Sequence, residues 1–152
     1  MSGKLLSEEL SGTDGSYSYK EFNEYGDVVF HKYEHEKSNG LKTEIYNIEY
    51  DNNRNKVRIE TFDKGILIHE RINIFNDRNL LTESLIINHE NNIERKHLYE
   101  YNENEKLLEE KYLNSDGIET FAYYFEYDEE GRITKKGERT STYNRYWTYE
   151  YY

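Results

Sequence analysis

Apolar and polar residues alternate along much of this chain with a period of two. Val57, Ile59 and Thr61 fall on one side of an extended segment, whereas positions 56, 58 and 60 are all charged. Such alternation is typical of half-buried β-strands. Helix is not expected, because the chain has a single Ala and a Gly or Asn about every dozen residues. The pattern predicts an all-β fold, an antiparallel meander of about twelve short strands.

A repeat underlies this pattern. An aromatic residue is followed by Asp or Asn at Phe22, Tyr50, Phe75, Tyr101 and Tyr127, and Tyr151 takes the same place near the end. The spacings are 28, 25, 26, 26 and 24 residues. We therefore expect one domain over residues 1–152, made of hairpin units of roughly 26 residues with these six anchors.

Two turns are expected in each unit. The first follows the anchor, as in Asp128-Glu129-Glu130-Gly131, where Asp can bond its own backbone and Gly accepts a positive φ. The second turns read Asn39-Gly40, Asp63-Lys64-Gly65, Asn91-Asn92 and Asp116-Gly117. We predict positive φ at Gly117 and Gly131. In the last unit, residues 137–142 lack a comparable signal.

The two ends of the chain resemble two halves of one unit. Residues 4–15 align without gaps on residues 106–117, and residues 147–152 read as the first strand of a unit. The sheet is therefore expected to be curled or closed, since closure would hide both edges. In an open sheet the exposed edge strands could instead pair between copies of the chain.

The net charge of the chain restricts the classes of molecule that it is expected to bind. The chain has 31 Asp and Glu against 20 Lys and Arg, a net charge of −11. This balance disfavours direct binding to nucleic acid and to membranes, and it favours basic partners. There are no cysteines, no apolar run long enough for a membrane span and no signal-peptide pattern at Met1, so we expect a cytoplasmic protein.

The sequence predicts no catalytic, metal or cofactor site, and thus no enzyme. His31 and His35 are four residues apart on a strand, about 13 Å, too far to share one ion unaided. The Glu pairs at 8–9, 109–110 and 129–130 are adjacent, so on a strand their side chains point to opposite faces.

The aromatic residues admit two interpretations. Phe121, Tyr123, Phe125 and Tyr127 share one strand face, where we expect a buried aromatic ladder. A second cluster lies at the C-terminus, at Tyr143, Tyr146, Trp147, Tyr149, Tyr151 and Tyr152. It could be the packed part of a terminal strand or a surface for a partner or a sugar.

One unit resembles a known family. The segment Phe125-x-Tyr127-Asp128-x-x-Gly131-Arg132-Ile133 is similar to the YD repeat of Rhs and related bacterial proteins. Tyr99-x-Tyr101-Asn102 and Ile48-x-Tyr50-Asp51 are weaker copies. The resemblance implies β-hairpin repeats, and small proteins of this kind resemble immunity proteins of Rhs and contact-dependent growth inhibition systems.

We therefore expect an immunity protein, or antitoxin, that binds a basic toxin domain, a nuclease, and occludes its active site. The residues expected to bind the partner are exposed carboxylates with aromatic neighbours: Glu34, Glu36, Glu60, Glu83, Glu109, Glu110, Glu129, Glu130, Tyr146 and Trp147. The alternative is a carbohydrate- or protein-binding surface module derived from a larger YD-repeat protein.

Overall fold

A computed structural model describes residues 6–12, 16–34 and 42–152. All regular structure in these residues is β-strand, so the predicted all-β fold is confirmed. The strands are β1 (Ser7–Ser11), β2 (Tyr17–Phe22), β3 (Val28–Glu34), β4 (Lys42–Tyr50), β5 (Lys56–Asp63), β6 (Ile66–Phe75), β7 (Leu81–Asn88), β8 (Ile93–Tyr101), β9 (Leu107–Leu113), β10 (Glu119–Tyr127), β11 (Ile133–Thr140) and β12 (Asn144–Thr148).

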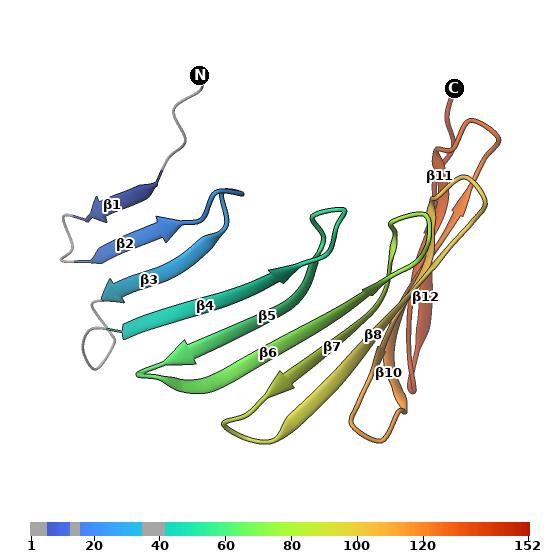
Figure 1. Cartoon of the computed structure of the whole chain (residues 1–152). Helices are drawn as coiled ribbons and strands as arrows, with labels where there is room; N and C mark the ends of the chain where they lie inside the picture. Colours follow the sequence, from blue (N-terminus) through green and yellow to red (C-terminus); the bar gives the residue numbers. More distant parts are fainter. Residues whose placement is uncertain (1–5, 13–15, 35–41) are drawn as a thin grey trace. The chain divides into compact units, whose positions relative to one another are not determined.

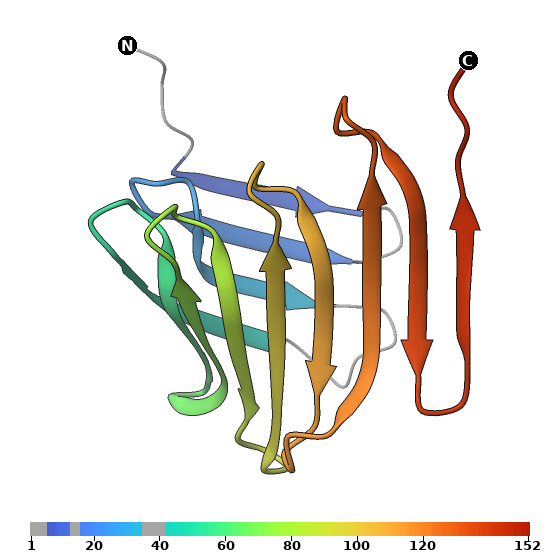
Figure 2. The ribbon, with the colours of Figure 1, turned by 90° about the vertical axis from the view of Figure 1, so that its right-hand side faces the viewer.

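The twelve strands follow one another in a single sheet in sequence order, which confirms the predicted meander (Figure 1). β1 and β12 are the two ends of this order, so the sheet is open among the described residues rather than closed. Figure 2 shows the strands from yellow to red, β8 to β12, running alternately up and down. No helix in the described residues is long and apolar enough to span a membrane.

The chain divides into two units, Met1–Glu70 and Arg71–Tyr152, and the boundary falls inside β6. Within each unit neighbouring strands are antiparallel, and the registers follow the repeat. In the first unit Ile48 lies opposite Ile59, and in the second unit His97 lies opposite Tyr112.

The predicted first turns share one hydrogen-bonding scheme. The Asp or Asn that follows each aromatic anchor, which we call the Asx anchor, donates its backbone N–H to the carbonyl of the residue four positions later. Its own carbonyl accepts from the backbone N–H of the residue three positions later. In the loop that starts at Asp128, the Asp128 backbone N–H donates to the Arg132 carbonyl at 3.0 Å. The Asp128 side-chain Oδ1 accepts from the Arg132 backbone N–H at 2.8 Å. The same scheme recurs at Asn23, Asp51, Asn76 and Asn102.

The fourth residue of each such turn lies in the left-handed region, with a positive φ. Gly131 has φ 77° and Gly117 has φ 74°, as predicted. Arg54, Asn79 and Glu105 hold the same position at φ 67°, 64° and 62°, although each carries a Cβ.

The second turns are more varied. Lys64 and Gly65 both have positive φ, at 50° and 79°, which is the pattern of a two-residue type I′ hairpin loop. The turn before β10 instead uses the Asx scheme of the first turns, with Asn114 as its anchor. The predicted turn at Asn39-Gly40 lies outside the described residues.

In the last unit the structure resolves the ambiguous stretch of residues 137–142. β11 continues to Thr140, and the chain turns at residues 141–143. Thr140 replaces the Asx anchor here, since its Oγ1 accepts from the backbone N–H of Thr142 at 3.2 Å and of Tyr143 at 3.3 Å. Gly137 is therefore a strand residue, and Tyr124 on the neighbouring strand covers it.

Burial is shallow throughout the described residues. Ala122 is their one fully buried hydrophobic residue, and none of their large side chains is fully buried. Aromatic side chains do pack across strands, with Tyr112, Phe121 and Tyr123 in edge-to-face contact. Phe125, a member of the expected aromatic ladder, is half-buried rather than fully buried.

Candidate partner-binding surfaces

Three hairpin loops of the second unit lie side by side at the same end of its strands. They are residues 76–80, 102–106 and 128–132, and we call them the acidic loop row. Arg78 joins the first two, because its Nη1 donates to the carbonyls of Asn102 and Glu103 at 3.5 and 3.2 Å. The Lys106 side chain reaches the third loop, with its Cε 3.2 Å from where a Cβ of Gly131 would lie.

The acidic loop row has six carboxylates and three basic side chains. The acidic residues are Asp77, Glu103, Glu105, Asp128, Glu129 and Glu130, and the basic residues are Arg78, Lys106 and Arg132. All of them except the anchor Asp128 are exposed. The row therefore presents a net negative charge on side chains that reach into water.

Hydrogen bonds hold the backbone of these loops in place. Arg132 pairs with Asp128 at 2.7 Å and with Glu130 at 3.0 Å. Although burial alone would raise the pKa of Asp128, hydrogen bonds from the Arg132 backbone and side chain bring that pKa below its usual value. The Asp128 carboxylate is thus held by Arg132, and Glu129 beside it is exposed.

The first unit has two loops of the same type. The Tyr50 hydroxyl donates to Asp27 at 2.6 Å and accepts from the Asn23 side chain at 2.7 Å. Lys56 forms an ion pair with Asp27. The Asp27 carboxylate is thus occupied within the unit, and these hydrogen bonds, acting against burial, lower its pKa.

Several of the predicted binding residues are paired within the sheet. Glu60 contacts Arg58 at 3.0 Å, and Glu83 contacts Lys96 at 2.8 Å. Glu109 contacts both Arg139 and Lys111, at 2.7 and 2.8 Å. These carboxylates are less available to a partner than the sequence alone implied, because each already has a cation.

The remaining predicted residues are dispersed. Glu110 accepts a hydrogen bond from the Tyr112 hydroxyl at 2.8 Å, and burial is the main reason that the pKa of Tyr112 is raised. Glu34 is exposed at the end of β3, and Glu36 lies outside the described residues. Of the predicted carboxylates, only Glu129 and Glu130 belong to the acidic loop row.

Tyr146 and Trp147 are exposed on opposite faces of β12, at 60% and 46% relative accessibility. Trp147 lines a pocket of about 270 Å³ on one face of β10–β12, together with Tyr123, Lys136, Glu138 and Tyr149. We call these five residues the aromatic pocket. Sequence reasoning found Trp147 and Tyr149, but Lys136 and Glu138 carried no signal because only strand register places them beside the aromatic rings.

Another pocket of the second unit lies over β8–β10 and has a volume of about 640 Å³. His97 and Tyr112 line it, and their rings are 4.2 Å apart. Burial lowers the pKa of His97, so its imidazole is neutral at physiological pH. The aromatic rings in its wall already contact one another, since Tyr112 also packs edge-to-face on Phe121, and this favours a packing role.

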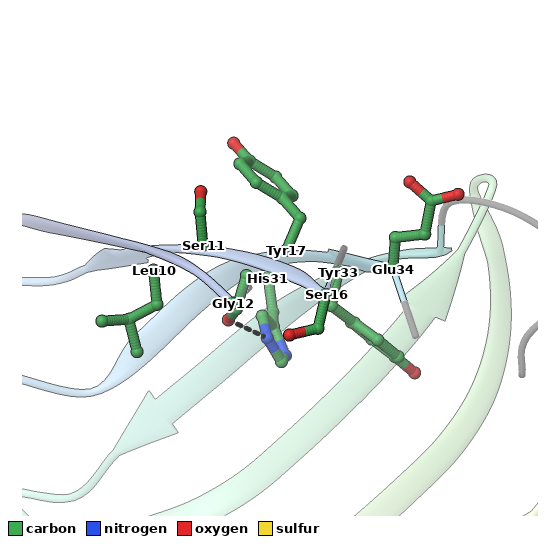
Figure 3. Close-up of a pocket in the computed structure, with 9 residues that line it drawn as sticks. Leu10, Ser11, Gly12, Ser16, Tyr17, His31, Tyr33 and Glu34 are labelled. Carbon is green, nitrogen blue, oxygen red and sulfur yellow. Dashed lines mark hydrogen bonds between the residues drawn. The ribbon is translucent and has the colours of Figure 1, made fainter. Parts of the chain in front are cut away.

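The first unit has a pocket of about 430 Å³ at β1–β3 (Figure 3). Figure 3 shows Leu10, His31 and Tyr33 on one side of the strands and Tyr17 and Glu34 on the other. The described lining residues thus come from both faces at the end of these strands.

A Ser–His contact lies in this pocket, with Ser18 Oγ 3.0 Å from His31 Nε2. A nucleophile–base pair needs a carboxylate that orients the imidazole. The carboxylate opposite, Glu44, instead accepts hydrogen bonds from Tyr33 and Tyr46. Burial lowers the pKa of His31. The geometry favours a cross-strand structural contact.

His35 lies outside the described residues, and the described residues hold no cluster of three or more metal-binding side chains.

Comparison with known proteins identifies a fold and no family. No protein-family model matches the sequence, and no curated protein matches it either. Among solved structures, the chain is similar to a porin-like protein from Bacteroides uniformis, with 14% identity and a TM-score of 0.51. The match covers 92% of this chain and 56% of that one, so the chain spans little more than half of its structural neighbour. At this identity the similarity concerns fold alone.

Proposed function

We propose that this protein is an immunity protein that binds a basic toxin domain, a nuclease, and occludes its active site in the cytoplasm. The observation that carries the proposal is the acidic loop row, which presents clustered carboxylates on hydrogen-bonded turns in a chain of net charge −11. Nuclease active sites attract phosphate and are therefore positively charged. Complementary charge speeds the encounter of two proteins and fixes their orientation.

The loop geometry supports this proposal further. A flexible acidic segment would lose conformational entropy on binding, whereas turns already closed by backbone and side-chain bonds lose little. Glu129 is exposed at the second position of its turn, where it can reach a partner without breaking a sheet contact. Glu109 is a weaker candidate than the sequence indicated, because reversing its charge would disrupt the pairs with Arg139 and Lys111.

The direct test is protection. If a toxin is encoded beside this gene, cells that express it should survive when this protein is co-expressed, and a basic domain should co-purify with it. Equal death with and without the protein, and no basic partner on purification, would exclude the immunity function.

A matched pair of variants locates the binding surface. Glu129 and Glu24 hold the same exposed position of the same turn type, in the second and first unit respectively. We expect Glu129→Lys to slow association with the toxin several-fold more than Glu24→Lys does, as measured by stopped-flow fluorescence. The difference should shrink as salt rises from 0.1 M to 1 M, because the screening length falls from about 10 Å to about 3 Å. Equal effects of the two variants would place the footprint away from the acidic loop row.

A further inference from the structure

The aromatic pocket lies on the strand face of β10–β12, apart from the loops that carry the proposed function. Strand register builds it. Tyr123 lies opposite Glu138, and Lys136 lies opposite Trp147. The chain continues past β12 beside β11, since the Tyr149 backbone N–H donates to the Thr134 carbonyl at 2.9 Å. The exposed rings of Trp147 and Tyr149 thereby stand beside polar side chains from β11.

The charges in this pocket oppose those of the whole chain. Glu138 is only 8% exposed and forms an ion pair with Arg145, so its charge is neutralised. The Lys136 ammonium lies 5.4 Å from the centre of the Tyr123 ring and 5.9 Å from that of Phe125, and contacts no carboxylate in the described residues. Arg145 also lies over the Trp147 ring at 5.6 Å. Because Glu138 and Arg145 neutralise each other, the Lys136 ammonium is the charge of the aromatic pocket that remains for a ligand.

These features restrict the ligand. A basic peptide would be repelled by Lys136, and an extended polyanion such as a nucleic acid would be repelled by the net charge of −11, whereas a short ligand with few carboxylates meets much less repulsion. The volume of about 270 Å³ is small, near the lower end of ligand sites at roughly 300 Å³, and suits a single ring. The electron-rich faces of Trp147 and Tyr149 suit a flat surface of C–H groups. The unpaired ammonium suits a carboxylate, with which it can form a charge-assisted hydrogen bond.

A pyranose ring that carries a carboxylate combines both requirements. We propose that the aromatic pocket binds a uronic-acid unit of an acidic oligosaccharide, with the sugar ring against Trp147 and Tyr149 and the carboxylate at Lys136. This binding does not depend on the proposed immunity function, because it uses a different surface and the opposite sign of charge.

The test uses the full chain and its single tryptophan. Because Trp147 is the only Trp, its emission reports on this pocket alone. We expect trigalacturonic acid to change the emission saturably, and a neutral galactose trisaccharide to bind at least tenfold more weakly. N-acetyltryptophanamide, titrated in parallel, corrects for collisional quenching. No saturable change with the acidic trisaccharide, or equal affinity for the neutral one, would overturn the proposal.

Variants inside and outside the aromatic pocket test whether the affinity for the trisaccharide depends on this pocket. Lys136→Met keeps the apolar stem and removes the ammonium, so it should weaken binding of the acidic trisaccharide at least tenfold. Tyr146→Ala changes β12, the strand that carries Trp147, on its opposite face and should leave the affinity unchanged. Circular dichroism checks that both variants fold, and Lys136→Gln serves as a second variant if Met does not. Unchanged affinity in a folded Lys136 variant, or equal losses with Tyr146→Ala, would also overturn the proposal.

Discussion

A glycine is required at position 137 in β11, because the Tyr124 ring on the neighbouring strand occupies the space that a side chain would need. The φ of Gly137 lies outside the left-handed region that favours glycine, yet a Cβ there would lie 2.0 Å from Cζ of Tyr124. The Tyr124 ring lies over this glycine, and its hydroxyl donates to Asn144 Oδ1 at 2.8 Å. Aromatic cover of a strand glycine compensates for the side chain that the glycine lacks.

We expect Gly137→Ala to displace the Tyr124 ring and to lower the free energy of unfolding by about 1–3 kcal/mol. Urea denaturation measures this change. In a Tyr124→Ala background the same substitution should cost much less, since no ring remains to be displaced. An equal cost in both backgrounds would show that the ring is not the cause.

Acidic side chains that are paired in the folded state make stability depend on pH. Hydrogen bonds from Arg139 lower the pKa of Glu119, and the two side chains are 2.8 Å apart. A carboxylate with a lowered folded pKa stabilises the protein above its unfolded pKa of about 4.3, and this contribution is lost as pH falls through the folded value.

The urea midpoint should therefore fall as pH is lowered from 5 towards 3, about the unfolded Glu pKa and below it. In Glu119→Gln, which keeps a hydrogen-bond acceptor without the titrating charge, this fall should be smaller. A Glu126→Gln variant is the control, because the Glu126 pair with Lys135 is at the exposed surface. An unchanged pH dependence in Glu119→Gln would exclude this pair as a source.

At the scale of the element, the same hairpin turn recurs along the chain. Its anchor residue satisfies backbone N–H groups, and its fourth residue has a positive φ whatever its type. Gly117 suits that position, whereas Glu105 adopts φ 62° against the steric preference of a residue with a Cβ.

This contrast predicts opposite effects of two substitutions. Gly117→Ala should destabilise the protein by about 1 kcal/mol, and Glu105→Gly should be neutral or stabilising by up to about 1 kcal/mol. Both turns have the same hydrogen-bonding scheme, so each serves as the control for the other. Thermal unfolding followed by circular dichroism measures both changes, and a loss of stability in Glu105→Gly would contradict the strain argument.

At the scale of the whole molecule, stability comes from neighbours along the sheet rather than from a deep core. Ala122 is the one fully buried hydrophobic residue among those described. In repeat proteins, each strand pair contributes with its nearest neighbours, and the sum holds the array together. The many ion pairs and cross-strand aromatic contacts in each unit fit this mode of stabilisation.

Because the described side chains bury little surface, the free energy of unfolding should fall only gradually as the urea concentration rises. The slope of unfolding free energy against urea scales with the surface newly exposed, and is typically about 1–3 kcal/mol/M for small proteins. For this chain we expect a value in the lower half of that range. A steeper slope in an otherwise two-state transition would indicate a large buried surface instead.

The sequence by itself determined the all-β meander and most of the described turns, because period-two alternation and Asx–Gly chemistry are local and need no distant partner, whereas it left the last turn, which has no Asx–Gly signal, open. Even positive φ at Gly117 and Gly131 followed from local turn chemistry. Only the tertiary structure decided which charges remain available. Glu109 is held by Arg139, 30 residues away, whereas Glu129 projects from its loop. Likewise, Lys136 joins Trp147 through register alone. Such pairings depend on how neighbouring strands align and on which side chains then meet, and alternation along one strand contains no information about that alignment.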